Sequence, residues 1–186
     1  MIGQERPSCA ADTDLKGAIA IGLDECTTAL EEALTGLTDE QVWGFPLPER
    51  HNITTIAVHC IENWNEYGLA AQGAESVVTH DNRFDMWGQS PREARPLQTD
   101  LPTVEEILST LRAVRDAMKK ALGELSVDDL RSRPGGHWWY DDESHVRADA
   151  YMRTIMHCMG HVRQIWMLRG VMGLTDEQGW PLQHWA

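Results

Sequence analysis

The sequence has few basic residues, no long apolar run and no signal-peptide pattern. Sixteen Lys and Arg stand against 29 Asp and Glu, and the net charge of −13 would repel a phosphate backbone or an acidic membrane surface. No apolar run approaches the ~20 residues of a membrane span. The first fifteen residues are polar and acidic, without a basic region followed by an apolar one. We therefore expect a cytoplasmic protein that binds neither nucleic acid nor membrane.

Cysteine is also scarce, with four residues in 186 and no CxxC spacing. Cys26, Cys60 and Cys158 fall in apolar helical patterns, whereas Cys9 does not, so we expect reduced cysteines that serve packing. Gly-rich phosphate loops and haem-attachment motifs are absent. With 42% hydrophobic residues, the chain is long enough for one domain with a core and short for two. We expect a single domain over residues 1–186.

Apolar residues recur at spacings of three and four in four segments, and no segment alternates as a strand would. The segments run from about Asp14 to Leu37, from Ile53 to Ala71, from Val104 to Leu125, and from near Ala148 past Gly170. Residues 74–101 are rich in turn residues and prolines, which indicates a long irregular connection between the second and third helices. The pattern predicts an all-α four-helix bundle.

A weak internal repeat relates the two halves of the chain. ALTGLTDEQ after the first helix resembles ALGELSVDD after the third, and each half then has a Thr-Ile pair shortly before His-Cys. Thr38 with Gln41 and Thr103 with Glu106 have the form of capping boxes. Coincidence remains open, because helical hairpins share composition. If the repeat is real, the second and fourth helices hold equivalent positions and each brings a histidine to the middle of the bundle.

His157 and His161 lie four residues apart in the apolar segment 151–170, so they stack on one helix face. Buried imidazoles without partners are costly, which favours a metal-binding or proton-transfer role over a chance pair. The repeat adds His59, and three imidazoles with no fourth protein ligand leave coordination positions open, as in a catalytic site. His51, His137 and His145 are rivals to His59 for the third position.

Two familiar metal motifs do not fit. HCMGH lacks the Glu that follows the first His of zinc metalloprotease helices, which disfavours a peptidase of that type. Glu-x-x-His is absent, which argues against a ferritin-like di-iron site.

The segments NITTIAVHCIENW and IMHCMGHVRQIWMLRGVMG resemble the DinB-like family, since H-x-x-x-H-x-x-Q-I is followed by a leucine, a basic residue and a glycine. The resemblance implies a DinB-like bundle, often a homodimer, whose metal triad falls on His59, His157 and His161. Several branches of that family are metal-dependent transferases that join a low-molecular-weight thiol to an electrophile, and many members have no established activity. The long connection and the patch Trp138, Trp139 and Tyr140 depart from the family, and they bear on the substrate more than on the metal.

Three hypotheses follow. The first is an enzyme, a thiol S-transferase or a hydrolase, in which a divalent metal activates a thiol or water against a small-molecule substrate; an all-imidazole site suits Zn or Ni, with Fe or Mn as further options. The second is a non-catalytic metal-binding stress-response bundle that acts through a protein partner. The third is a metal-free bundle with core histidines.

Glu62, Asn63 and Glu66 lie within about two turns of His59, and one of them could support a ligand or act as a base. Gln164 could orient a ligand or bind substrate, although an outward-facing glutamine is the commoner case. Arg163 and Arg169 could bind an anion, although a single arginine on a helix more often serves the surface. The catalytic candidates are Gln164, Arg163, Glu62 and Glu66.

Overall fold

The structure is a computed structural model, which describes residues 14–47, 50–78, 101–134 and 145–175. Helices make up most of the described part of the chain, and it contains no β-strand element. No helix among these residues is long and apolar enough to cross a membrane. The long helices are α1 (Leu15–Leu34), α3 (Ile53–Asn63), α5 (Val104–Glu124) and α7 (Arg147–Val171), and the short ones are α2 (Asp39–Trp43) and α6 (Val127–Leu130). The predicted all-α class is confirmed.

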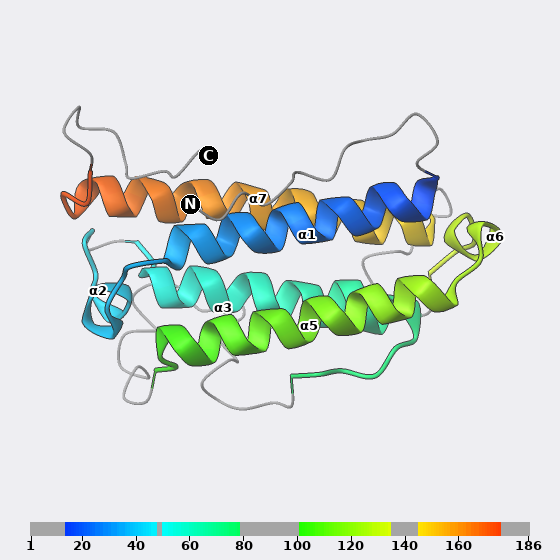
Figure 1. The fold of residues 1–186 in the computed structure, drawn as a ribbon, viewed down its shortest axis with the longest axis horizontal. Helices are drawn as coiled ribbons and strands as arrows, with labels where there is room; N and C mark the ends of the chain where they lie inside the picture. Colours follow the sequence, from blue (N-terminus) through cyan, green and yellow to red (C-terminus); the bar gives the residue numbers. More distant parts are fainter. Residues whose placement is uncertain (1–13, 48–49, 79–100, 135–144, 176–186) are drawn as a thin grey trace, which may run out of the picture.

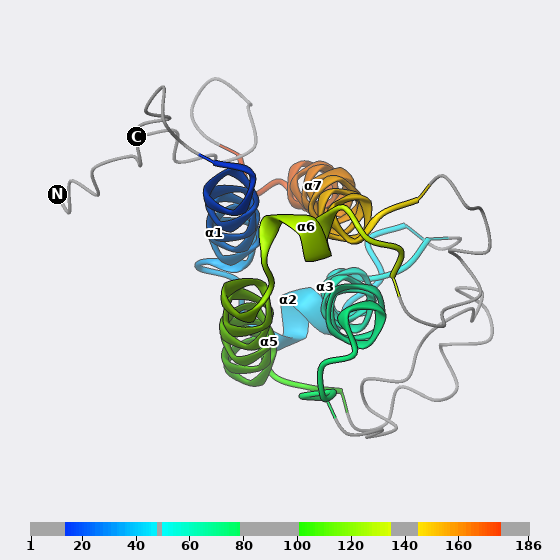
Figure 2. The ribbon, with the colours of Figure 1, turned by 90° about the vertical axis from the view of Figure 1, so that its right-hand side faces the viewer.

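The long helices form a bundle in which α1 lies diagonally opposite α3, and α5 diagonally opposite α7 (Figures 1 and 2). Each of α1 and α3 packs against both α5 and α7. Figure 1 shows α2 at one end of the bundle and α6 at the other, and α3 and α7 running in opposite directions. Each half of the chain is thus a long helix, a short helix and a second long helix, as the internal repeat predicted. The second long helices of the two halves, α3 and α7, are neighbours.

One apolar core lies between the four helices. Side chains with no exposed surface come from each of them, including Leu23 of α1, Ile61 of α3, Leu111 of α5 and Ile165 of α7. Each such burial contributes roughly 1.5–3 kcal/mol, which is the main force that holds α3 against α7.

Two helix starts follow directly from the local sequence. Gln41 N–H donates to Thr38 Oγ1 (3.3 Å), and Thr38 N–H donates back to Gln41 Oε1 (2.9 Å). Thr103 and Glu106 make the same reciprocal pair at the start of α5. Both capping boxes are those that the sequence predicted, and the loss of such a cap costs about 1 kcal/mol.

The second predicted helix is interrupted. The sequence predicts one helix through Ala71, but α3 ends at Asn63 and continues as a π-helix, η1 (Trp64–Leu69), and a 3-10 turn, η2 (Ala70–Gln72). Residues of η1 contact parts of the chain outside this helix. Asn65 Oδ1 accepts hydrogen bonds from the backbone N–H groups of Val77 and Val78, and Gly68 packs so closely on Met118 that a Cβ there would clash with Met118 Cε. Such wide turns are frequent at functional sites.

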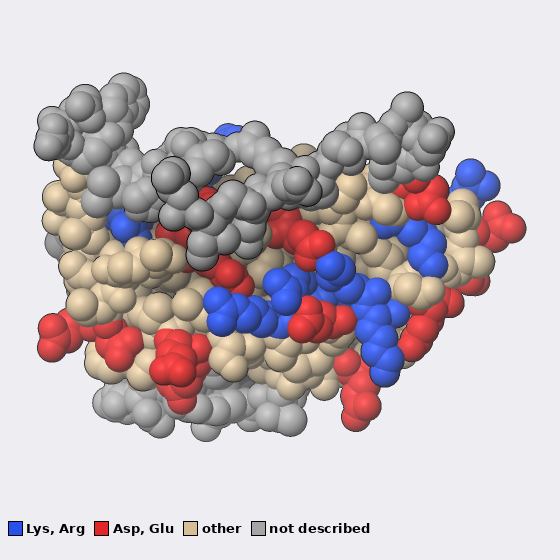
Figure 3. Space-filling view, viewed as in Figure 1, with Lys and Arg blue, Asp and Glu red and all other residues tan. Residues whose placement is uncertain are grey.

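Charged side chains join α1 to α5 on the face shown in Figure 3. Lys119 Nζ lies 2.6 Å from Asp24 Oδ2, and Arg112 Nε donates to Glu31 Oε1 at 2.8 Å. Lys16 Nζ donates to Leu125 O just beyond the end of α5. Basic and acidic side chains thus lie side by side on this face (Figure 3), and Lys16, Arg112 and Lys119 join α1 to α5 or to the residue that follows it.

Several sequence predictions fall outside the described residues. They are the greater part of the long connection, the patch Trp138, Trp139 and Tyr140, the rival His137, Cys9 and the C-terminal tail.

Candidate metal site

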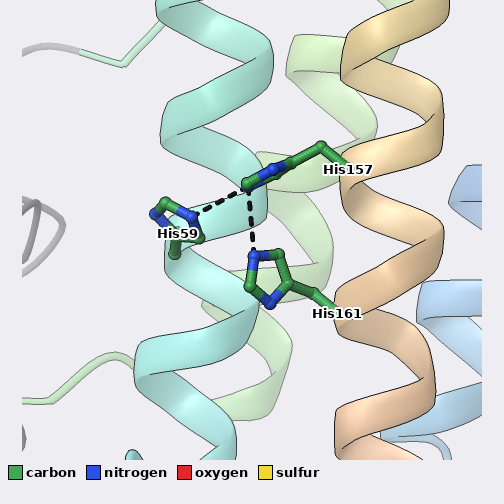
Figure 4. Close-up of side chains that lie close together, drawn as sticks. All are labelled: His59, His157 and His161. Carbon is green, nitrogen blue, oxygen red and sulfur yellow. Dashed lines mark hydrogen bonds between the residues drawn. The ribbon is translucent and has the colours of Figure 1, made fainter.

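Three histidines meet on the seam between α3 and α7 (Figure 4). His157 Nε2 lies 2.9 Å from His59 Nε2 and 3.1 Å from His161 Nε2. The candidate ligand atoms of all three residues lie within 4.8 Å of one another. His157 and His161 stack because they are four residues apart on α7, and His59 reaches them because α3 runs alongside. The sequence predicted this convergence.

The neighbouring cysteines explain why the imidazoles lie at the border of the core. Cys60 and Cys158 each follow a histidine of the triad and are fully buried. One residue further along a helix rotates the side chain by about 100°. Burial of the cysteines therefore turns His59 and His157 toward the outer edge of the seam, where both are half-buried.

The contacts within the triad favour a bound cation. A ring nitrogen carries either one lone pair or one hydrogen, so it can align well with only one neighbour. His157 Nε2 has two neighbouring nitrogens at hydrogen-bond distance, and protons alone cannot align it with both. Tetrahedral zinc with Zn–N bonds of 2.0–2.1 Å would place ligand nitrogens about 3.3 Å apart, within roughly half an ångström of these two distances. The residues present fit a metal ion.

Gln164 fixes the tautomer of one candidate ligand. His161 Nδ1 donates to Gln164 Oε1 at 2.8 Å, which places the proton on Nδ1 and leaves the Nε2 lone pair facing the other two rings. A hydrogen bond of this kind orients metal-binding histidines in many proteins. The contact matches one of the two roles that the sequence suggested for Gln164, that of orienting a ligand.

Burial and neighbouring charge keep His59 and His157 neutral by lowering their pKa values. Burial, followed by the charges of His161, His157 and His51, lowers the pKa of His59 from 6.5 to about 4. Burial, followed by His161 and Arg153, lowers the pKa of His157 to about 4. Neutral imidazole is the form that binds a metal, so both rings are ready to do so at neutral pH.

The comparisons with known proteins agree with this architecture. Residues 23–165 match the family model of the DinB superfamily. The chain belongs to the DinB superfamily. A conserved protein of Enterococcus faecalis, known from its crystal structure, is similar in fold, with a TM-score of 0.67 and 16% sequence identity over 84% of this chain and 96% of that chain. No curated protein matches the sequence significantly.

The other histidines remain outside the triad of this DinB-superfamily bundle. The group within 4.8 Å contains neither His51 nor His145, and among the described residues no carboxylate joins it. His51 nevertheless lies close enough for the charge of His161 to help burial lower the pKa of His51. Among the described residues, His51 and His145 therefore do not replace His59 as the third candidate ligand.

The other candidate residues from the sequence lie partly near the triad and partly away from it. Glu62 is buried one turn beyond His59, Glu66 is half-buried, and Arg163 is exposed on α7. Arg169 is mostly buried and donates from Nη1 to Ala33 O (3.0 Å) and Thr35 O (2.9 Å) beyond the triad. Arg169 therefore caps backbone carbonyls at the C-terminal end of α1. Its interpretation as an anion-binding residue is not supported.

A separate hollow of about 830 Å³ lies between α2 and the start of α5, and no histidine of the triad lines it. It is lined by Leu37, Thr38, Asp39, Thr103, Val104, Glu105, Leu108, Ser109 and Arg112. It therefore has no part in the metal site.

Sequence reasoning did not identify Arg153 as part of the site. This residue precedes His157 by four positions, so the spacing rule that joined His157 to His161 also places Arg153 on their face. Its positive charge contributes to the lowered pKa of His157. The signal was present in the sequence, but a single arginine on a helix usually serves the surface.

Proposed function

We propose that this protein is a divalent-metal-dependent enzyme that activates a thiol, or alternatively water, for attack on a small electrophile. The observation that carries the proposal is the convergence of three imidazole nitrogens, two of them on rings held neutral by their surroundings. Among the described residues no fourth protein ligand joins them. An open coordination position is the mark of a catalytic site.

Each residue of the site has a defined task. His59, His157 and His161 present nitrogen lone pairs to the cation, and Gln164 keeps the proton of His161 on the far side of the ring. A bound divalent cation would lower the pKa of a coordinated thiol or water and stabilise the resulting anion. Three imidazoles suit Zn or Ni, and they also accept Fe or Mn.

The choice of a thiol rests on the DinB family, several branches of which are thiol transferases. A transferase would join the sulfur of a low-molecular-weight thiol to the electrophile, whereas a hydrolase would use water in the same position. The family also supports a homodimer, which we propose on that ground alone. Light scattering coupled to gel filtration would test the dimer.

The central test measures metal content and then thiol conjugation to 1-chloro-2,4-dinitrobenzene with a panel of small thiols. We expect conjugation that requires the metal and is lost in His157→Ala. Met156→Ala is the matched control, because Met156 precedes His157 on α7 and is 70% exposed. A protein that holds metal but catalyses neither conjugation nor hydrolysis would contradict the enzyme proposal and favour the non-catalytic metal-binding bundle.

A further inference from the structure

Exposed apolar side chains gather on one face of α7. Of the six large apolar side chains that are exposed in the described part of the chain, four belong to this helix, and they are between 43% and 70% exposed. These four residues, which we call the α7 stripe, are Met152, Met156, Met167 and Val171. Their spacings of four, eleven and four residues place them within a face about 100° wide. A contiguous apolar group on a surface marks an interaction site, whereas single exposed apolar residues do not.

The α7 stripe lies apart from both the core and the triad. α7 stands at one corner of the bundle, and its fully buried residues, such as Cys158 and Ile165, face the other helices (Figure 2). Met156 is turned by about 160° from Cys158 around the helix axis, so it points away from the bundle. It is turned by about 100° from His157. The stripe therefore runs beside the metal site without including it.

The stretch of α7 that carries the stripe has no acidic residue. Between Ala150 and Val171 there is neither Asp nor Glu, and Asp149 just before this stretch accepts a hydrogen bond from Val146 N–H at the start of the helix. By contrast, the acidic residues of α1 and α5 are Asp24, Glu25, Glu31, Glu32, Glu105, Glu106, Asp116 and Glu124. Two copies of a chain with a net charge of −13 repel each other. A second copy therefore meets less repulsion at the outer face of α7 than at α1 or α5.

Gly160 lies on the same face, near the middle of the stripe. Glycine is less favourable than alanine inside a helix, so its presence there calls for a reason. At Gly22 and Gly68 a Cβ would clash with other side chains of the chain, which supplies one. Gly160 is exposed, and a Cβ there would meet no atom of the described residues within 4 Å. Packing within this part of the chain does not require the glycine, but its bare backbone lets a second helix approach closely.

We propose that the α7 stripe packs against the same stripe of a second copy of this chain, with the two α7 helices antiparallel. This inference rests on the homodimer included in the proposed function, and it assigns that dimer a surface. In a two-fold contact each pair of facing residues occurs twice. In the register centred between Met159 and Gly160, Met152 faces the partner's Met167. Met159 faces the partner's Gly160, where the missing side chain leaves room for it.

The same register accommodates the charge on this face and relates the two metal sites. Met156 faces the partner's Arg163, whose aliphatic stem covers the methionine while its guanidinium stays in water. His157 and His161 lie on either side of the centre of the register, so the two triads stand at the same level of the dimer. Each triad is complete within its own chain. The contact therefore adds no ligand to the metal.

The first test is sedimentation velocity of the purified protein over a range of concentrations. Met152→Glu/Met167→Glu brings four carboxylates into the contact, where carboxylate faces carboxylate. We expect it to be a monomer at concentrations at which the wild type is a dimer, a rise in the dimer Kd of at least ~100-fold. Ser109→Glu/Ala113→Glu is the matched control, because it adds the same charge at two exposed positions of α5 and should leave the Kd unchanged. An unchanged metal content would show that each variant keeps the fold.

The second test examines the register by cross-linking with a short bismaleimide. All variants carry Cys9→Ser, so that the native cysteines that remain are the three buried ones. A mixture of Met152→Cys and Met167→Cys should give a covalent dimer. Neither variant should do so alone, because fifteen residues of helix, about 22 Å, separate each position from its own copy in the partner.

The outcomes separate this surface from the proposed function. A wild type that is a monomer at every concentration would overturn the homodimer and the surface together, and binding of that monomer to vesicles of phosphatidylcholine and phosphatidylglycerol would assign the stripe to a lipid surface instead. A dimer that persists in Met152→Glu/Met167→Glu would overturn the surface alone. Cross-linking of Met152→Cys with itself would overturn the antiparallel arrangement. The enzyme proposal is tested separately, by metal-dependent conjugation.

Discussion

Acid should destabilise the metal-free protein through the triad itself. The pKa values of His59 and His157 lie at about 4 in the folded protein, below the ordinary 6.5 that we take for the unfolded chain. Between these values the unfolded chain binds more protons than the folded one, so stability falls as pH falls. Above about pH 6.5 both histidines are neutral in the folded and the unfolded chain, so they do not reduce the free energy of unfolding. As the pH falls toward 4, only the unfolded chain binds the extra protons, and the free energy of unfolding decreases.

The size of the effect follows from the same pKa values. A difference of about 2.5 in pKa corresponds to ~3.4 kcal/mol for one fully shielded group. Both rings are half-buried, so water screens the added charge and we take about half of that value for each. The rings also touch, so they titrate as a pair and their contributions do not simply add. We therefore expect about 2–3 kcal/mol to be lost between about pH 7 and pH 4.5.

The assay is urea unfolding in the presence of a chelator at several pH values across this range. The double variant His59→Gln/His157→Gln shares every carboxylate with the wild type and lacks only the two shifted imidazoles. Its stability should fall less with acid, by about the 2–3 kcal/mol given above. Parallel pH profiles for the two proteins would refute the reasoning, because they would assign the acid sensitivity to other groups.

Three further predictions concern the metal. The purified protein should hold close to one divalent cation per chain, and His157→Ala or His161→Ala should abolish this in elemental analysis; full occupancy in the double variant would contradict the site. His59→Ala should weaken metal binding at least ~10-fold in competition titrations while circular dichroism shows a folded bundle, and unchanged affinity would mean that α7 alone holds the metal. Gln164→Leu frees the tautomer of His161 and should weaken binding ~10-fold or more, whereas an unchanged affinity would show that the hydrogen bond is incidental.

Local sequence was sufficient for much of the fold because helix periodicity and capping are local signals. The boxes at Thr38 and Thr103 place the starts of α2 and α5, and the apolar spacing places α1 and α5 to within a few residues. Leu37 lies beyond α1 because the helix ends at Leu34, and Gly36 then takes a left-handed φ of 75°. The end of α3 depends on contacts with distant residues such as Met118, which no local pattern contains.

The same difference between local signals and long-range contacts applies to the candidate site. His157 and His161 were found from spacing on one helix, whereas His59 was joined to them only by the internal repeat and by the resemblance to the DinB-like family. Asn63 was weighed only as one polar neighbour of His59 among three. Its Oδ1 is buried and accepts no hydrogen bond in the described part of the chain. A sequence shows which polar groups are present, but whether a buried oxygen lacks a donor depends on how two helices pair. The packing of α3 against α7 is therefore the level at which the surroundings of the triad can first be described.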